Sequence, residues 1–265
     1  MCGPELLTYD LGQGVCAFST ERRGGYSEGA YASFNANAYC GDDERMVRLN
    51  RDLLCESLGL ETSRLIIPHQ IHGARVRRID EAFFMQTDAV KAATLEGVDA
   101  VMTDVPKVCV SVSTADCIPI LIYDRVHHAV AAVHAGWRST EAVLQAMAGA
   151  YGTRPQDVEA AIGPGISLEA FEVGDEVYEA FRTAGFPMEE IARRYPATGD
   201  GSGRMEKWHL DLWQANRGLL EGCGVPSARI HLAGVCTYLH SERFFSARRL
   251  GIRSGRILNG IFLTD

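Results

Sequence analysis

The stretch VCVSVSTADCIPILIYDRVHHAVAAVHAGW, residues 108–137, holds three apolar runs that are separated by short polar turns. Runs of this length that are rich in Val, Ile and Ala are typical of buried β-strands. A similar run, VDAVMTD at residues 98–104, comes just before them. The connections leave little room for long crossover helices, so we expect antiparallel or mixed pairing among these strands. The stretch therefore predicts the centre of a β-sheet.

The rest of the chain alternates between strand-like and helix-like segments. Further strands are expected at residues 14–20, 64–70, 74–79, 228–235 and 256–263. Amphipathic helices are expected at residues 41–60, 139–152, 174–186 and 210–224. Grouped strands with flanking helices indicate an α/β protein of the α+β type, in which helices cover the sheets. No repeat or linker divides the sequence, so residues 1–265 are expected to form one domain.

Composition and charge narrow the class of protein. The chain has 265 residues, of which 46% are hydrophobic and 23% are charged, as in ordinary globular proteins. Its net charge of -8 gives no basic surplus to neutralise phosphates, so nucleic-acid and membrane partners are not expected. No apolar stretch is long enough to span a membrane, and the N-terminus lacks the features of a signal peptide. We therefore expect a cytoplasmic protein, either a monomer or a small homo-oligomer.

The cysteines agree with this location. The chain has eight of them, and no two have the C-x-x-C spacing of zinc ribbons or redox motifs. A chain of this length does not need disulfides to stabilise a small core. We expect all eight thiols to be reduced, and most of them to be packing residues.

Ionisable side chains stand at the ends or breaks of three predicted strands. His69 and His72 follow one strand, Asp116 and Cys117 lie at a break between two others, and His134 ends a fourth. Imidazole nitrogen and thiolate sulfur are ligands that zinc prefers, and three protein ligands leave one position open for water. The same atoms would suit a nucleophilic Cys117 that is activated by His134. Each residue could also be an ordinary core or turn residue, and the spacing alone leaves all three interpretations open.

Nine short motifs, taken together, resemble those of one protein family. From residue 69 to 249 the chain reads, in order, HQIHGARV, DAVMTD, TADCIPILIYD, AVHAGWRST, AIGPGIS with FEVGDEV, LDLWQANR, and CTY with FFSARR. FSTERRGG and FNANAYCGDD precede them. This order resembles the YfiH family, also called the laccase-domain or purine nucleoside phosphorylase family, over nearly the whole chain. The resemblance implies a single α/β domain in which two mixed sheets pack face to face between helical layers.

The resemblance also implies a metal site and an anion contact. The family's metal ligands, two histidines and one cysteine, fall on His72, Cys117 and His134. Its Asn-Arg pair falls on Asn50 and Arg51, which lie on or beside the apolar stripe of the helix expected at residues 41–60. Arg51 would then bind phosphate or another substrate anion, because a guanidinium is always charged and bonds in a bidentate manner. A solvated helix residue is the alternative.

Four further residues are candidates for the site. Asn35 matches the asparagine that precedes the family's first helix, and Gln70 lies in the H-Q-x-H-G motif, so both are expected to bind substrate. His69 is a candidate donor to the leaving group, or it orients His72. Asp116 is a candidate proton shuttle, or it orients a ligand histidine.

The chain departs from the family pattern at three positions. Gly165 stands where the family often has cysteine, Ala247 replaces the usual aromatic residue, and Leu250 replaces an acidic one. None of these changes touches the three metal ligands. They would alter the wall of a pocket and hence which substrate fits.

The resemblance favours a zinc-dependent enzyme of purine nucleosides. Such an enzyme would cleave adenosine, inosine, guanosine and methylthioadenosine with phosphate, and would also deaminate adenosine, so nucleoside and phosphate are the expected partners. Zinc with three protein ligands can activate water for attack on a purine carbon. The H-x-E…P-C-x-x-C signature of the zinc base deaminases is absent.

Three alternatives stay open. One is a copper-dependent laccase that oxidises polyphenols, although multicopper oxidases need more histidines, commonly in H-x-H pairs, and no such pair occurs here. Another is a hydrolase or amidase of cell-wall metabolism that uses Cys117 as a nucleophile. The last is a binding protein that keeps the fold and the metal but has no turnover.

Overall fold

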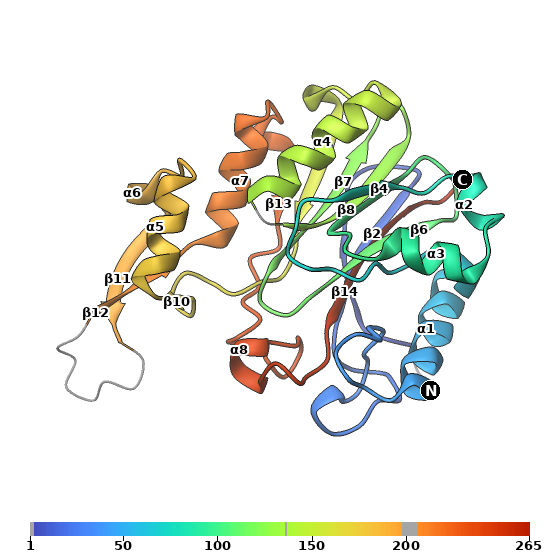
Figure 1. The fold of residues 1–265 in the computed structure, drawn as a ribbon, viewed down its shortest axis with the longest axis horizontal. Coiled ribbons are helices and arrows are strands. Elements are labelled where there is room, and N and C mark those ends of the chain that lie inside the picture. The colour runs from blue at the N-terminus through green and yellow to red at the C-terminus, as the bar shows by residue number, and fades with distance from the viewer. Residues whose placement is uncertain (1–2, 136, 198–205) are drawn as a thin grey trace.

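The computed structural model describes residues 3–135, 137–197 and 206–265, and Figure 1 shows a layered α+β fold with an arm at one end. The five-stranded sheet has the order β1 (Leu6–Tyr9), β2 (Val15–Thr20), β14 (Ile257–Leu263), β6 (Cys109–Thr114), β3 (Leu65–Ile66). The six-stranded sheet has the order β13 (Ile230–Leu232), β9 (Val158–Ile162), β7 (Ile118–Asp124), β8 (Ala129–Ala135), β5 (Ala100–Thr103), β4 (Val76–Arg78). Both sheets are mixed, because β3–β6, β4–β5 and β13–β9 are parallel pairs among antiparallel ones.

Strands β6 and β7 follow each other along the chain but belong to different sheets. β7 and β8 form the antiparallel pair that the sequence predicts, with Ile118 opposite Ala135. β6 instead lies between β14 and β3 in the other sheet. Residues 115–117 therefore carry the chain from one layer to the other. Every residue of β6 and β7 is buried, so their apolar patterns do not reveal that they lie in different layers.

The main core lies between the two facing sheets. Val112 of β6 and Ile261 of β14 belong to one buried cluster with Leu121 of β7 and Val130 of β8. Burial of one such side chain contributes roughly 1.5–3 kcal/mol. The packed strands therefore form a rigid frame for the segments that leave their ends.

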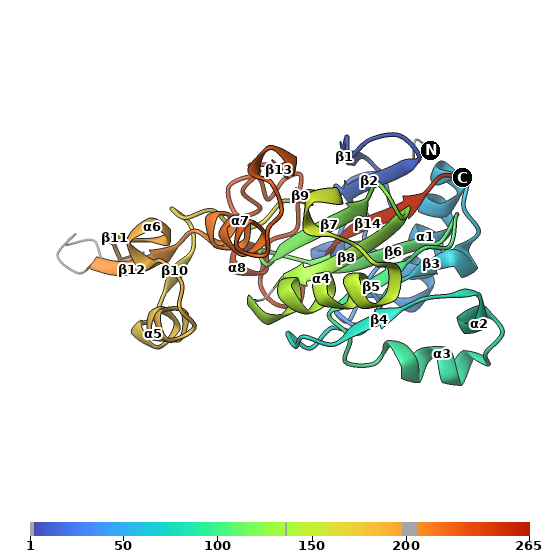
Figure 2. The same ribbon diagram turned by 90° about the horizontal axis from the view of Figure 1, so that it is seen from above.

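Helices cover the outer faces of both sheets. On the six-stranded sheet, α4 (Trp137–Tyr151) and α7 (Leu212–Gly222) bury Met147 and Leu220 against strand residues. On the five-stranded sheet, α1 (Glu44–Leu58) packs Leu54 against Phe18, and the carboxylate of Asp43 caps its N-terminus. Figure 2 shows the layers edge-on. The α-β-β-α arrangement implied by the resemblance is confirmed.

The arm is a small third sheet with two helices. Its strands have the order β10 (Glu172–Val173), β12 (Glu206–Leu210), β11 (Ala192–Pro196), and α5 (Asp175–Thr183) and α6 (Met188–Ile191) accompany them. Figures 1 and 2 show it projecting beyond the sandwich. The sequence predicts a helix here but not the sheet, because strands as short and polar as ARRYP and EKWHL carry no clear apolar pattern.

The remaining elements are short. The helices α2 (Glu81–Phe84) and α3 (Asp88–Leu95) lie between β4 and β5, and α8 (Ala247–Leu250) precedes β14. Turns of 3₁₀ helix occur at Gly29–Tyr31, Thr62–Arg64, Pro155–Asp157 and Ser227–Arg229. In the described ranges no helix combines the length and apolarity that a membrane crossing requires. Seven cysteines are free thiols, while Cys2 lies outside the described residues.

A glycine in the central strand β14 provides a test of the core. A β-carbon at Gly260 would lie 2.6 Å from Cζ of Phe18 and 2.9 Å from Sγ of Cys109, and both side chains are fully buried. We expect Gly260→Ala to lower the free energy of unfolding by about 1–3 kcal/mol, because these groups have no room to move away. Urea denaturation measures the change.

Gly218→Ala is the matched control, because a β-carbon at this position of α7 meets nothing within 4 Å. Alanine is favoured over glycine in a helix by about 0.5–1 kcal/mol, so this variant should be as stable as the parent or more so. A Gly260→Ala protein that unfolds at the parent's urea concentration would contradict the packing described for β14.

Candidate metal centre

Three separate segments bring one ligand group each to the same point. β8 carries His134 near its end, the crossover between β6 and β7 carries Cys117, and the loop after β3 carries His72. Their ligand atoms all lie within 4.8 Å of one another. Nε2 of His72 is 3.8 Å from Sγ of Cys117, and the two imidazole rings lie edge to face with centroids 4.7 Å apart. This group could hold a metal ion with three protein ligands.

Asp99, which sequence reasoning missed, holds two of these segments in place. Its fully buried carboxylate accepts hydrogen bonds from the backbone N–H groups of His72 and Gly73, at 2.9 and 2.7 Å. It also lies 2.9 Å from Nδ1 of His134, so that nitrogen carries the proton and Nε2 is left to act as a ligand. This hydrogen bond fixes the tautomer and the orientation of the His134 ring. In the sequence, the only signal of Asp99 was its place in the DAVMTD motif.

The electrostatic environment favours the thiolate form of Cys117. Burial alone would raise the pKa of this thiol, but hydrogen bonds and charge from His134 and His72 outweigh it and lower the pKa to about 6. Burial alone would lower the pKa of His134, whereas Asp99 and Cys117 raise it to about 9. The thiolate is the form of cysteine that binds metals and attacks electrophiles, so the environment suits both chemistries.

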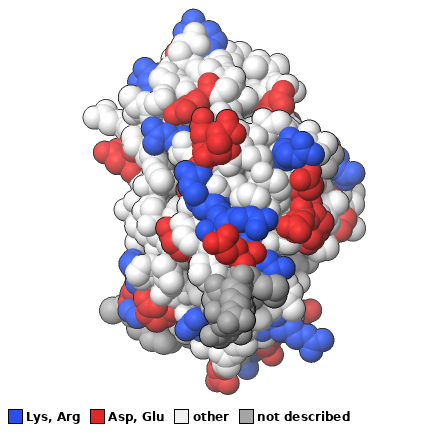
Figure 3. All heavy atoms as spheres, turned by 90° about the vertical axis from the view of Figure 1, so that its left-hand side faces the viewer, with Lys and Arg blue, Asp and Glu red and all other residues white. Residues whose placement is uncertain are grey.

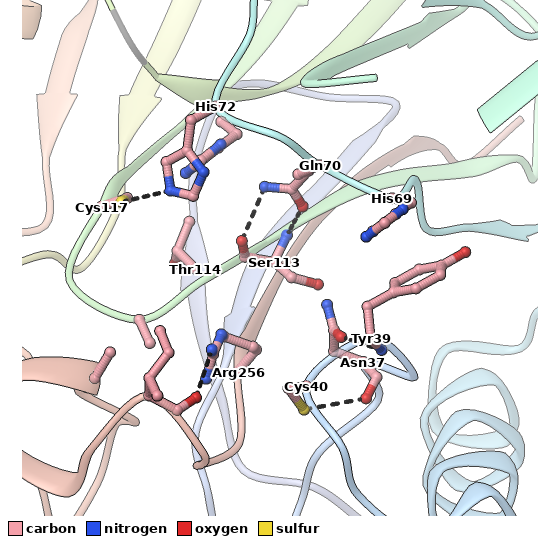
Figure 4. Close-up of a pocket in the computed structure, with 14 residues that line it drawn as sticks. Asn37, Tyr39, Cys40, His69, Gln70, His72, Ser113, Thr114, Cys117 and Arg256 are labelled. Carbon is pink, nitrogen blue, oxygen red and sulfur yellow. Dashed lines mark hydrogen bonds between the residues drawn. The ribbon is translucent and has the colours of Figure 1, made fainter. Parts of the chain in front are cut away.

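A cavity of about 360 Å³ opens beside the three ligand groups, and Figure 4 shows its wall. It is lined by Asn37, Tyr39, Cys40, His69, Gln70, His72, Ser113, Thr114, Ala115, Cys117, His134, Ala247, Ile252 and Arg256. Tyr39 is 52% exposed and stacks on His69, with ring centroids 4.3 Å apart. The volume lies in the range of roughly 300–1,000 Å³ that is common for small-molecule sites.

His69 and Gln70 line the cavity, although their polar groups have partners in the protein. Nδ1 of His69 is 2.8 Å from a carboxylate oxygen of Glu96. The amide of Gln70 accepts from the backbone N–H of Ser113 and donates to its carbonyl. Gln70 therefore ties the loop that carries His72 to the end of β6. This geometry supports an orienting role for Gln70 rather than direct substrate binding.

Asp116 does not point its carboxylate at the metal ligands. One oxygen accepts from the hydroxyl of Thr237 and the other from the backbone N–H of Arg248, both at 2.7 Å. Its backbone has φ of 91°, a value that is strained for a residue with a side chain. These bonds hold the crossover beside Cys117 and favour an orienting role, while the role of Asp116 as a proton shuttle stays a prediction.

Asn35 and Arg51 lie behind the cavity wall rather than on it. Asn35 is fully buried, and its amide bonds to Asp42 and to the backbone of Asn37 and Arg256. Nε of Arg51 donates to the carbonyl of Ala36 at 2.8 Å. The two side chains shape the loop that carries Asn37 and Tyr39 into the cavity. This place does not favour direct contact with substrate, and the substrate-binding roles of Asn35 and Arg51 stay predictions.

The three departures from the family pattern have different places in the structure. Ala247 lines the cavity, so the missing aromatic ring leaves space at the wall. Gly165 lies outside it, and a β-carbon there would come within 2.3 Å of Cδ1 of Ile118. Leu250 is exposed and is not a lining residue. Of the three, only the change at Ala247 can act on a ligand directly.

The sandwich and the site define an α/β protein with a small-molecule cavity against a candidate metal centre. The family model described as "Multi-copper polyphenol oxidoreductase laccase" matches residues 16–264, so the chain belongs to this laccase-like family, which is the YfiH family.

Relatives of known name and structure agree with this assignment. A "Purine nucleoside phosphorylase" of Bacteroides thetaiotaomicron is 48% identical over 254 residues, which cover 94% of this chain and 92% of the relative. "Adenosine deaminase RL5", from an unknown prokaryotic organism, is 42% identical over 255 residues, 94% of each chain. The crystal structure of YlmD from Geobacillus stearothermophilus is similar with a TM-score of 0.82 and 30% identity, and covers 97% of this chain and 94% of that one.

Proposed function

We propose that this protein is a zinc-dependent purine nucleoside enzyme of the cytoplasm. It would cleave adenosine, inosine, guanosine and methylthioadenosine with phosphate, and would deaminate adenosine. The observation that carries the proposal is the meeting of His72, Cys117 and His134 at one wall of a cavity that suits a small molecule. The names of two relatives, a phosphorylase and a deaminase, support both reactions.

The donor set fits zinc. Two imidazole nitrogens and a thiolate match its preference, and the ligand atoms face a cavity in which a fourth position is open to a reactant. A zinc ion held there would supply Lewis acidity for hydrolysis of the 6-amino group. Two neighbouring residues position the candidate ligands. Asp99 fixes the ring of His134, and Gln70 holds the loop of His72 against β6.

The aromatic wall suits a purine base. Tyr39 and His69 present stacked rings at the edge of the cavity, and Glu96 fixes the ring of His69. A flat heterocycle can stack on such a ring and gain roughly 0.5–1.5 kcal/mol beyond the burial of its area. We assign Tyr39 to base binding, and His69 to its support.

Copper-dependent phenol oxidation is the second candidate, favoured by the description of the family model. In the described residues, one group of His, Cys, Asp and Glu side chains has the spacing for a metal. No methionine lies among the residues described as lining the cavity, so the long axial ligand of a blue-copper site is missing from the wall. The site therefore fits zinc better than it fits a copper oxidase.

A cysteine hydrolase is the third candidate, favoured by the lowered pKa of Cys117 and its contact with His134. Such an enzyme would need Cys117 and His134, but it would not need His72 or a metal. The position of His72 against the thiolate, 3.8 Å from Sγ, favours the metal centre over a catalytic dyad.

The proposal is tested on protein purified without added metal. Elemental analysis should find about one zinc per chain, and a nucleoside panel should show phosphate-dependent release of bases and phosphate-independent release of ammonia from adenosine. Chelation should abolish the deamination, and zinc should restore it. Oxidation of phenols by a copper-loaded protein that is inert to nucleosides would establish the laccase. Turnover that survives chelation and stops on thiol alkylation would establish the hydrolase.

A further inference from the structure

Arg256 is the one lysine or arginine among the described residues that line the cavity. It stands directly before β14, and Figure 4 shows it on the far side of the cavity from His72 and Cys117. No Asp or Glu is among these lining residues, and in the described part of the chain Arg256 forms no ion pair. Its positive charge therefore faces the cavity without a carboxylate to balance it.

The guanidinium is held firmly on one side and is free on another. Nη1 donates to the carbonyls of Ser254 and Gly255, at 2.6 and 3.0 Å, and Nη2 donates to the carbonyl of Ile252 at 3.0 Å. A guanidinium has five N–H donors, so these three bonds leave Nε and one hydrogen of Nη2, which lie side by side. Two parallel donors of this kind match two oxygens of a phosphate. Because the bonds to the backbone fix the group, little side-chain entropy remains to be lost on binding.

Asn37 offers a further donor in the same cavity. Its Oδ1 accepts from the backbone N–H of Tyr39 at 2.7 Å, which turns the amide nitrogen into the cavity (Figure 4). This nitrogen donates to no group in the described part of the chain. The loop that carries Asn37 is tied to Arg256, since Asn35 accepts from the backbone N–H of Arg256 at 3.0 Å. The two donor groups are thus built into one connected unit.

We propose that Arg256, assisted by Asn37, binds the phosphate that attacks the nucleoside. The inference rests on the proposed function and deepens it, because it divides the cavity into a metal wall and an anion wall. In the reaction, a phosphate oxygen forms a bond to C1′ of the ribose and the C1′–N9 bond breaks. The proton of hydrogen phosphate ends on the departing purine. Arg256 holds the nucleophile and takes no part in the deamination of adenosine.

Arg51 is the competing candidate, and the structure argues against it. Its Nε is engaged with the carbonyl of Ala36, behind the loop that Asn37 and Tyr39 occupy. Burial lowers the pKa of Arg51, whose side chain lies under this loop. From behind this loop, Arg51 can affect phosphate binding only indirectly, by holding the loop in position. Arg256, in contrast, lines the cavity itself.

The test compares Arg256→Gln and Arg256→Lys with Arg253→Gln, an exposed arginine of the same loop that does not line the cavity. Binding of inorganic phosphate to the zinc-loaded protein is measured by calorimetry, and the KM for phosphate is measured with inosine. We expect Arg256→Gln to weaken phosphate binding and raise this KM by about 10- to 100-fold, as for the loss of a charge-assisted hydrogen bond. For Arg256→Lys, the phosphate affinity and this KM should lie between those of the parent and of Arg256→Gln. For Arg253→Gln, both values should match those of the parent.

Adenosine deamination, the KM for nucleoside and the melting temperature separate a role in phosphate binding from a structural role. For Arg256→Gln the ratio of phosphorolysis to adenosine deamination should fall at least tenfold at low phosphate, with melting temperatures used to confirm that both Arg256 variants fold. A parallel rise in the KM values for phosphate and nucleoside, or a parent that binds no phosphate, would overturn the proposal. Phosphate binding that depends on Arg256 in a protein without phosphorolysis would keep the anion site and reject the proposed function.

Discussion

Cys117→Ser is expected to lose the metal and to reduce adenosine deamination by roughly 10³-fold or more, since Lewis-acid stabilisation worth several kcal/mol disappears with the ion. Serine keeps the size of the side chain but cannot supply a thiolate, and the two remaining histidines hold zinc poorly. Elemental analysis and an ammonia-release assay on the same preparation measure both effects. The fold should persist, because Cys117 lies at a crossover and not within the clusters of the core.

Cys223→Ser is the control, because this partly buried thiol at the end of α7 lies outside the cavity. It should keep both zinc and activity. His72→Ala then separates the metal centre from a Cys117–His134 dyad. As a ligand, His72 is needed for zinc and turnover, whereas a dyad would work without it. A Cys117→Ser protein that retains stoichiometric zinc and full activity would refute the proposed ligand set.

The sequence reveals the sandwich because its strands are strongly apolar and closely spaced. It does not reveal which sheet each strand joins, since β6 and β7 are buried on every residue and read alike. It also misses the arm, whose strands β11 and β12 carry as many charged as apolar side chains. Pattern alone finds buried strands well, whereas layer membership depends on contacts between residues that are distant in sequence.

For the candidate site, too, the sequence indicates some residues and misses others. The candidate ligands His72, Cys117 and His134 are indicated by the family motifs, because the ionisable groups near strand ends leave several interpretations open by themselves. The role of Asp99 is not indicated, because it depends on a carboxylate that reaches backbone groups 26 to 28 residues away. The sequence indicates Arg51 but not Arg256 for a related reason. A motif names an arginine, but only the packing of the loop shows which guanidinium faces the cavity.

The second large effect is expected from Asp99. Asp99→Ala leaves the backbone N–H groups of His72 and Gly73 and the ring N–H of His134 without their buried acceptor. An unmet buried donor costs about 1–3 kcal/mol, and His134 is buried whereas His72 is exposed and Gly73 half-buried, so metal-free protein should lose roughly 2–4 kcal/mol of unfolding free energy. Asp99→Asn keeps the shape and one oxygen acceptor but removes the charge, and the orientation of His134 weakens.

Zinc affinity in Asp99→Asn should fall by about 10- to 100-fold, as is usual when the residue that orients a ligand histidine is changed. Competition with a chromophoric chelator measures this affinity, and urea denaturation measures stability. Asp104→Asn is the control, since Asp104 follows the other end of β5 and pairs with Arg78 at the surface. An exposed pair of this kind contributes about 0–1 kcal/mol, so zinc affinity should stay at the parent's value. If Asp99→Asn binds zinc as tightly as Asp104→Asn does, the carboxylate serves only the fold. The position of His134 would then depend on β8 alone.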